Sequence, residues 1–409
     1  MLPSPEPCPL CCPGDPVAFD FDQIIPRRHT DCLKYDELEA RYGRAELLPL
    51  WVADMDFRVA PCVTAALQRL VDHGVYGYHV RRPRHQQAIV DWWGRRHGYT
   101  VHPEAIVYTP GVVPVLSHLV QALTGEDDGV LVQSPVYYPF FWLPRVNRRR
   151  LVINPLIEHQ GDYQIDFDDL EAKAAQARIL IFSSPHNPVG RVWRPDELER
   201  VASICLRHGL VLVADEIHND LVFAPHRHTP VARLSPEIER ITVTAHAASK
   251  TFNLASLATA YVLIADAGLR ARFAAHHEAL AVDGLNPFGL EATVAAFNEG
   301  EPWLAELLVY LRGNYQYLCA QLQARLPQVR VGPLEGTYLA WLDCRATGLT
   351  PPQLRQRLVE VGGLALNDGP IFGPGGEGFQ RLNLACPRAT LAEAVARLER
   401  ALALPGSDR

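Results

Sequence analysis

Short apolar runs alternate with amphipathic stretches through most of this chain, and that alternation limits the fold to very few classes. The runs are rich in β-branched residues and too short for helices, which is typical of buried strands. They begin at about residues 105, 130, 178, 210, 241 and 259. Helical patterns, such as Pro195 to His208 before Gly209, separate several of them. This alternation predicts an α/β fold with a mainly parallel sheet covered by helices on both faces.

Polar side chains and glycines follow directly after several of these predicted strands. Ligands of such sheets bind outside the carboxyl ends of the strands, so residues at those positions are expected to share one site. They are Gly111, Tyr137, Asn187, Asp215 and Lys250. The turn at Gly111 also opens a predicted helix, and the free N–H groups at a helix start suit a phosphate. The sequence therefore predicts one ligand site with a phosphate position.

Lysine is scarce, because the 409 residues contain only Lys34, Lys173 and Lys250. Lys173 lies on the polar face of a charged amphipathic helix, and Lys34 lies in an N-terminal arm. Lys250 follows a buried strand, where burial lowers the pKa of an amine below its free value of about 10.4. A neutral amine forms a Schiff base with an aldehyde, so Lys250 is the candidate for that chemistry.

The pattern of elements divides the chain into four parts. Residues 1–16 are rich in proline without periodicity, which predicts a flexible tail. Residues 17–58 are an arm that joins the small domain, residues 59–289 form a large domain, and residues 290–409 form a smaller α+β domain. The predicted elements of the smaller domain are helices at 290–298 and 301–326, strands at 334–343 and 379–385, a helix at 351–361 and a terminal helix. The G-x-G-x-x-G match at 373–378 precedes a strand, so it predicts a mobile loop at the mouth of the site and not a dinucleotide-binding turn.

Charge and composition exclude several partners. The net charge is −7 and no basic cluster suits a phosphate backbone, so no nucleic-acid partner is expected. No apolar run approaches a membrane span and no signal-peptide pattern is present, so a cytoplasmic protein without a membrane partner is expected. The nine cysteines are scattered, and Cys8-Pro-Leu-Cys11-Cys12 has no second ligand pair, so no metal is predicted. Asp54 and Asp56 allow a metal site, but we interpret them as carboxylates that order a loop.

Six motifs, in this order, resemble those of the PatB/MalY-type cystathionine β-lyases, or C–S lyases. These belong to the fold type I pyridoxal phosphate (PLP) enzymes of the aminotransferase class I/II superfamily. The motifs are Trp51-Val-Ala-Asp-Met-Asp-Phe57, Tyr76-Gly-Tyr78, Ser183-Ser-Pro-His-Asn-Pro-Val-Gly190, Asp215-Glu-Ile-His218, Ser249-Lys-Thr-Phe-Asn253 and Arg381-Leu-Asn-Leu-Ala-Cys-Pro-Arg388. The resemblance runs from about residue 19 to the C-terminus, and it implies the PLP fold type I and PLP as the cofactor.

The resemblance implies a role for each matched side chain near the cofactor ring. Lys250 would carry the Schiff base and move the substrate proton, and Asp215 would pair with the pyridine nitrogen. Asn187 would contact the phenolic oxygen and the substrate, and His218 would lie near the same oxygen. Tyr137 would stack on the ring, and Tyr137 and Lys250 would be the catalytic residues. A protonated ring accepts the electrons left on the substrate Cα, which is why it needs an anionic partner.

The resemblance also implies contacts for the phosphate and for the substrate carboxylate. The amides of Val112 and Val113 and the side chain of Ser249 would hold the phosphate. Tyr78 would reach the phosphate of a neighbouring subunit, which implies a homodimer with shared sites. Arg381 would bind the α-carboxylate of the substrate through its planar fork of donors.

Several positions depart from the wider family pattern. Ala247 stands three residues before Lys250, where many relatives have a phosphate-binding serine, and Ala258 stands where aminotransferases carry an arginine. Asn286-Pro-Phe and Asn367-Asp-Gly are also unusual, and both are candidates for lining the substrate pocket. These departures leave the cofactor assignment unchanged but leave the particular substrate open.

The expected reaction is a PLP-dependent α,β-elimination on an L-cysteine S-conjugate such as cystathionine, which gives a thiol, pyruvate and ammonia. An aminotransferase, or another PLP enzyme that reacts at Cα, is the alternative on the same scaffold, and no sequence feature excludes it. A non-catalytic PLP-binding regulatory protein is a second alternative, which an intact Lys250, Asp215 and Arg381 disfavour. The expected partner is a small amino-acid substrate.

Overall fold

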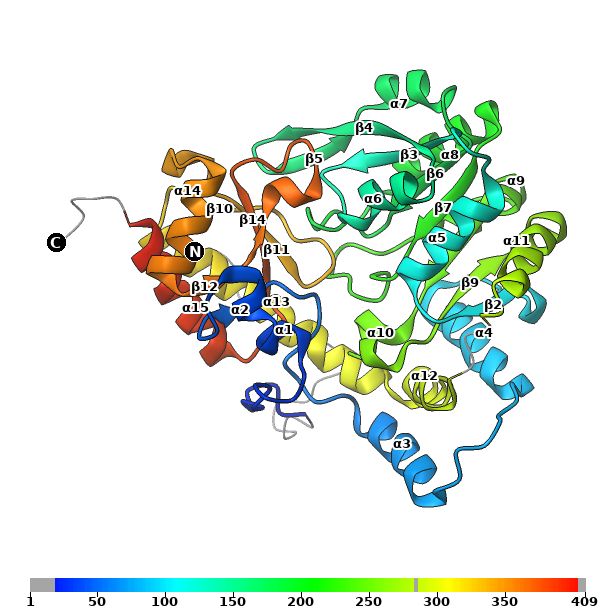
Figure 1. Cartoon of the computed structure of the whole chain (residues 1–409), viewed down its shortest axis with the longest axis horizontal. Helices are drawn as coiled ribbons and strands as arrows, with labels where there is room; N and C mark the ends of the chain where they lie inside the picture. The colour runs from blue at the N-terminus through cyan, green and yellow to red at the C-terminus, as the bar shows by residue number, and fades with distance from the viewer. Residues whose placement is uncertain (1–18, 283–285, 404–409) are drawn as a thin grey trace.

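An eight-stranded sheet forms the centre of the larger domain, with the strand order β2-β9-β8-β7-β6-β3-β4-β5 (Figure 1). The strands are β2 Ile106–Thr109, β3 Gly129–Ser134, β4 Arg150–His159, β5 Asp162–Ile165, β6 Ile179–Ser183, β7 Val211–Asp215, β8 Thr242–His246 and β9 Ala260–Ile264. Strands β8, β7, β6, β3 and β4 pair in parallel, and only the pairs made by β9 and β5 are antiparallel. The predicted α/β fold with a mainly parallel sheet is therefore confirmed.

This computed structural model describes residues 19–282 and 286–403. The predicted tail at 1–16, with its cysteine motif, lies outside the described residues. The described part of the arm contains two short helices, α1 Leu33–Asp36 and α2 Leu38–Tyr42, and the strand β1 Leu48–Pro49. Strand β1 pairs in parallel with β12 Leu364–Ala365, so the arm is hydrogen-bonded to the C-terminal domain.

Both faces of the large sheet are buried. Alternate residues of its strands belong to two different apolar clusters, one on each face. Val130 and Val132 pack with the helices on one face, and Leu131 packs with those on the other. The first face is covered by α5 Val112–Leu123, α6 Pro139–Val146 and α11 Ala267–Ala279, and the second by α7 Phe167–Ala174, α8 Pro195–His208 and α9 Pro236–Ile241. Burial on both sides explains why the parallel strands have continuous apolar sequences without polar alternation.

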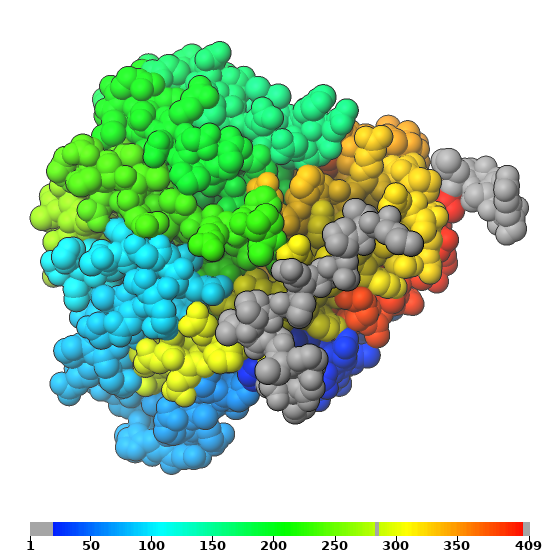
Figure 2. Space-filling view, turned by 180° about the vertical axis from the view of Figure 1, so that it is seen from behind, coloured from blue at the N-terminus to red at the C-terminus, as the bar shows by residue number. Residues whose placement is uncertain are grey.

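A third apolar cluster joins the large domain to the C-terminal one. Its long helices from the large domain and the connection are α3 Pro61–His73, α4 Pro83–His97, α12 Pro287–Glu299 and α13 Glu301–Arg325, and two further helices come from the small domain. Helix α13 runs from α12 to the small domain, and the space-filling view from behind shows the two domains side by side (Figures 1 and 2). Within this cluster Trp92 stacks on Phe297 with ring centroids 4.9 Å apart. No helix of the described residues is long and apolar enough to cross a bilayer.

The small domain is built on a four-stranded sheet with the order β10-β11-β14-β13. Its strands are β10 Arg330–Val331, β11 Leu339–Asp343, β13 Asn367–Asp368 and β14 Phe379–Asn383, and its helices are α14 Pro351–Gln356 and α15 Arg388–Leu402. The predicted strand at 334–343 begins only at Leu339. The reason is that the amides of Glu335, Gly336 and Thr337 donate to Gly190 and Leu221 and not to a strand neighbour. The predicted helix at 351–361 ends as α-helix at Gln356 and continues as a π-helical turn to Gly362.

Candidate active site

A cavity of about 230 Å³ lies at the carboxyl ends of the parallel strands. It is lined by residues that follow β2, β3, β6, β7 and β8, which is the edge where ligands bind such sheets. The predicted residues among them are Gly111, Val112, Val113, Tyr137, Asn187, Asp215, His218, Ser249 and Lys250. The structure therefore brings together every side chain and amide expected around a cofactor, except Tyr78.

Lys250 lies in α10 (Ala248–Thr251), the helical turn that follows β8. Its Nζ donates a hydrogen bond to the Ala53 carbonyl at 2.6 Å. Burial lowers the pKa of Lys250 to about 8, although the Asp54 carboxylate acts in the opposite direction. A substantial fraction of this amine is therefore neutral, and hence nucleophilic, near pH 8.

The other two lysines are paired with carboxylates. Lys34 is fully buried, with its Nζ 2.7 Å from Asp56 and 3.5 Å from Asp54. Burial disfavours its charge, but the two carboxylates together raise the pKa of Lys34 above its usual value. Lys173 pairs with Asp169 one turn away on α7, at 2.7 Å. Lys250 is thus the lysine suited to an aldehyde, and Asp54 and Asp56 are engaged with cations.

Asp215 is a buried carboxylate with little compensation for its charge. The N–H of Ile217, at 3.2 Å, is its one hydrogen-bond donor among the described residues. Burial raises the pKa of Asp215 to about 7, and the Ile217 N–H and the Lys250 cation only partly oppose this. A cationic group in the cavity would lower that pKa again, so this position suits a protonated ring nitrogen.

Helix α5 presents its N-terminus to the cavity, with Gly111 as the capping residue. The first amides of a helix have no partner within the helix, so those of Val112 and Val113 are free to donate to an anion. Ser249 lines the same cavity. Ala247, at the start of α10, contributes no hydroxyl.

Two aromatic side chains add an uncharged wall to the cavity. Tyr137 is partly buried and packs against the Tyr138 ring at 5.0 Å between centroids, and burial raises the pKa of its phenol above the usual range. His218 is buried, and burial lowers the pKa of its imidazole well below the usual value, with Lys250 and Arg381 acting in the same direction. His218 is therefore neutral, and its Nδ1 has no hydrogen-bond partner within the described chain.

Arg381, on β14, is only 2% exposed and its guanidinium bonds to neutral oxygens. It donates to the side-chain oxygen of Asn187 at 3.0 Å, to the carbonyl of Trp51 at 2.8 Å and to the side-chain oxygen of Asn367. Within the described residues no carboxylate pairs with it, and its Nε has no acceptor. Burial lowers the pKa of Arg381 to about 10, so a carboxylate ligand would relieve an uncompensated charge.

Three other predicted positions lie away from the cavity or at its border. Tyr78 is fully exposed on the segment between α3 and α4, outside the cavity of its own chain. Asn286 caps α12 by accepting from the amides of Phe288 and Gly289, and it does not line the cavity. The 373–378 loop begins at Gly373, where a Cβ would meet the Phe141 ring at 2.3 Å, so it packs closely against α6.

Some residues of the site were given no role from the sequence, although Ala53, Ser183 and Ile217 lie within the matched motifs. Ala53 acts through its backbone carbonyl, which also accepts a hydrogen bond from the Tyr338 hydroxyl at 2.8 Å. Ser183 and Ile217 line the cavity beside the predicted residues. Tyr338 comes from the small domain, edge-on to His218 with ring centroids 5.9 Å apart. Only the folded chain brings it to this position.

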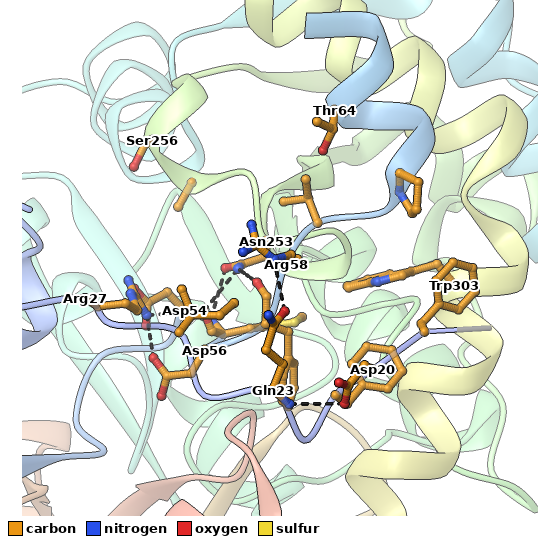
Figure 3. A pocket seen from close by; sticks show the side chains of 18 of the residues that line it. Asp20, Gln23, Arg27, Asp54, Asp56, Arg58, Thr64, Asn253, Ser256 and Trp303 are labelled. Atoms are coloured by element: carbon orange, nitrogen blue, oxygen red, sulfur yellow. Dashed lines mark hydrogen bonds and ion pairs between the residues drawn. The ribbon is translucent and has the colours of Figure 1, made fainter. Parts of the chain in front are cut away.

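A larger hollow of about 950 Å³ lies next to the cavity and shares Ala255 with it. Its walls come from the N-terminal arm, from α3 and from residues 54–57. The last of these belong to the stretch 51–57, which we call the 51–57 segment. Figure 3 shows Arg27 beside Asp54 and Asp56, with Asn253 on the same wall. The hollow therefore borders the active-site cavity without containing its reactive groups.

The fold and the site define a member of the aminotransferase class I and II family, to which this chain belongs. The family model matches residues 45–398. The chain is 42% identical over 386 residues to the cystathionine beta-lyase PatB of Bacillus subtilis, which covers 94% of this chain and 100% of that relative. The predicted resemblance is thereby confirmed.

Two solved structures superpose on almost the entire chain. A PLP-bound putative aminotransferase from Clostridium difficile 630 has a TM-score of 0.93 at 40% identity, covering 94% of this chain and 100% of that one. A PLP-bound C–S lyase from Staphylococcus hominis has a TM-score of 0.89 at 32% identity, covering 95% and 99%. The whole architecture, and not only the sheet, is therefore shared.

Proposed function

We propose that this protein is a PLP-dependent carbon–sulfur lyase that performs α,β-elimination on an L-cysteine S-conjugate such as cystathionine. The products are a thiol, pyruvate and ammonia. The observation that carries the proposal is a cavity lined by the Lys250 amine and the Asp215 carboxylate, with the Arg381 guanidinium bonded to the cavity residue Asn187. No carboxylate of the described residues pairs with Arg381. Relatives named as a cystathionine beta-lyase and a C–S lyase align over nearly the whole chain.

The groups around the cavity complement the charges of the phosphate, the ring nitrogen and the aldehyde of PLP. Val112, Val113 and Ser249 would hold the phosphate, because free amides at a helix start attract an anion. Asp215 would pair with the ring nitrogen, and Lys250 would bind the aldehyde. When bound, PLP supplies an aldehyde that links to amines and a ring that accepts the electrons left on Cα.

The side chains of this protein then position the amino acid and move its proton. Arg381 binds the α-carboxylate through charge-assisted hydrogen bonds, which orient Cα toward Lys250. The substrate amine would take the place of Lys250 on the aldehyde, and the Lys250 amine that is released takes the proton from Cα. The electron pair left on Cα forms the double bond to Cβ while the C–S pair leaves with the sulfur. The resulting aminoacrylate hydrolyses to pyruvate and ammonia.

The proposal includes a homodimer in which Tyr78 completes the phosphate position of the neighbouring subunit. The segment between α3 and α4 projects from the body of the molecule (Figure 1). It exposes Val75, Tyr76, Tyr78 and Val80. Contiguous exposed apolar side chains mark an interaction surface, and a second copy would cover them.

The proposal also places the protein in the cytoplasm. Six cysteines of the described residues carry free thiols. Disulfides are rare in the reducing cytoplasm, so this pattern supports that compartment.

Incubation with an S-substituted L-cysteine in the absence of any keto acid tests the reaction. We expect the protein to release thiol and pyruvate in equal amounts, and Lys250→Ala to release neither, because it lacks the amine. Thiol is followed with a chromogenic disulfide reagent and pyruvate with a coupled dehydrogenase. An absolute requirement for a keto acid would instead identify an aminotransferase, and bound PLP that no amino acid perturbs would identify a non-catalytic protein.

A further inference from the structure

The 51–57 segment contains no helix or strand, and side chains from other elements hold its carbonyl groups. The donors are Arg381 to Trp51, Asn383 to Val52 and Asp54, Lys250 to Ala53, and Asn253 to Met55 and Phe57. Backbone carbonyls in a buried segment require such partners, and here other elements supply them. The segment therefore joins the element that carries Lys250 to the strand that carries Arg381.

Two cations fix the carboxylates of this segment from the side of the arm. Arg27 donates to Asp54 and to Asp56 at 2.6 Å each (Figure 3). Lys34 donates to Asp56 at 2.7 Å, and its own carbonyl accepts from the Trp51 indole at 3.0 Å. A fully buried lysine is rare unless it is paired, and loss of one partner leaves a buried charge without compensation. We call Arg27, Lys34, Asp54 and Asp56 the arm cluster.

The Ala53 carbonyl, directly before Asp54, contacts the catalytic lysine. It accepts from Lys250 at 2.6 Å and from the Tyr338 hydroxyl at 2.8 Å, which uses both of its lone pairs. This carbonyl is the one hydrogen-bond acceptor of Lys250 among the described residues. Arg381, in contrast, is also held by two asparagine side chains. A shift of the segment would therefore misplace Lys250 and leave Arg381 largely in position.

We propose that Lys34 is a positioning residue for the lyase reaction, and that through Asp54 and Asp56 it fixes the Ala53 carbonyl that orients the Lys250 amine. This inference rests on the proposed role of Lys250 in moving the Cα proton. Lys34 itself does not line the cavity. A misplacement of about 1 Å at a reacting group can reduce a rate about 100-fold, which is the scale of effect expected here.

Lys34→Met, Asp56→Asn and the double variant test the inference. Each single change leaves a buried charge with fewer partners, whereas the double change removes one charge of each sign and leaves Arg27 paired with Asp54. We expect the free energy of unfolding to recover in the double variant relative to both single variants. We expect kcat to stay about 10-fold to 100-fold below the wild type in all three, with KM changed less than about threefold.

A second measurement does not depend on turnover. Cofactor-free protein is mixed with PLP and reduced with borohydride, and the rate at which Lys250 is captured is read by peptide mass spectrometry. We expect slower capture in the double variant and an unchanged rate in Lys173→Met, a matched loss of an ion-paired lysine on the surface. If the protein is not a C–S lyase, the wild type forms no pyruvate, but the capture assay still reports on positioning.

Two outcomes would overturn the inference. Recovery of kcat together with stability in the double variant would mean that the arm cluster only stabilises the fold. Capture of Lys250 at the wild-type rate in a folded double variant would mean that the Ala53 carbonyl does not orient the amine.

Discussion

This protein buries two sets of a lysine and an aspartate. In one set the charged forms are stabilised, and in the other burial shifts both pKa values toward the neutral forms. Lys34 and Asp56 are 2.7 Å apart, and the carboxylates raise the pKa of Lys34 above its usual value. Lys250 and Asp215 form no direct ion pair, and burial lowers the pKa of the amine to about 8 and raises that of the acid to about 7. Opposed shifts of this kind are typical of functional sites, where charge is compensated only when a ligand binds.

The raised pKa of Asp215 predicts a pH-dependent stability for the cofactor-free protein. The native state keeps this proton up to about pH 7, whereas the unfolded state loses it near 3.8, so stability falls as pH rises through that window. Asp215→Asn removes the effect. We compare the free energy of unfolding of Asp215→Asn with that of the wild type. We expect the difference, in favour of the variant, to be about 2 kcal/mol larger at pH 8 than at pH 5.

Urea unfolding at the two pH values measures this difference. Groups that do not interact with Asp215 cancel between the two proteins, and Lys250→Met in both proteins removes the amine that is coupled to it. An advantage that is constant with pH would show that Asp215 is not protonated in the native state. Saturating PLP should reverse the preference, because the wild-type carboxylate then gains a cationic partner.

At the scale of elements, the loop after β6 connects the cavity to the small domain. Its Gly190 carbonyl accepts from the amides of Glu335 and Gly336, at 3.0 Å each. Gly190 has a φ of +78°, and a Cβ there would lie 2.8 Å from Leu334. The glycine therefore permits both the turn that follows Asn187 and the close approach of the two domains.

Comparison of Gly190→Ala with Gly209→Ala separates the backbone strain of a left-handed φ from the steric effect of the close approach between the domains. Gly209 also has a left-handed φ, of +65°, but a Cβ there would meet no atom of the described residues within 4 Å. We expect Gly209→Ala to lower the free energy of unfolding by about 1 kcal/mol through backbone strain alone. Gly190→Ala should lower it by at least about 1 kcal/mol more, because the new methyl group is overpacked. Equal losses in urea titrations would contradict the close contact.

At the scale of the whole molecule, the groups that would bind the amino acid come from different parts of the chain. Lys250 follows a strand of the large domain, Arg381 lies on a strand of the small domain, and the 51–57 segment of the arm touches both. Tyr78 is fully exposed and does not line the cavity of its own chain. One subunit therefore has most of the site, and the proposed dimer would complete it.

Mixed subunits test that dimer directly. Lys250→Ala and Tyr78→Ala subunits are co-expressed in equal amounts with different tags, and elimination is measured for the mixture. If Tyr78 serves the neighbouring subunit, a mixed dimer has one site with both changes and one intact site, so random pairing restores about a quarter of wild-type activity. Activity equal to the mean of the two parent variants would place Tyr78 outside the shared site.

The sheet and most of the cavity were predictable from local sequence patterns. Parallel strands end at a common edge, so residues such as Asn187, Asp215 and Lys250 lie close together there and their proximity does not depend on the conformation of the intervening loops. The hairpin formed by β4 and β5 was not predicted. Helix α6 was missed because its eight residues include Pro139 and Pro144, and α11 because its apolar residues follow no clear period. The start of β11 was also misplaced, since its preceding amides bond across to Gly190.

By itself the sequence determined the α/β class, the one lysine suited to an aldehyde and the family, because these depend on short-range order and residue type. Only the tertiary structure decided how Lys34 is paired, which carbonyl holds Lys250 and how Tyr338 reaches the cavity. These contacts join segments that are distant along the chain, and several use backbone carbonyls, which every residue carries. They depend on packing between domains, and no local pattern encodes that packing.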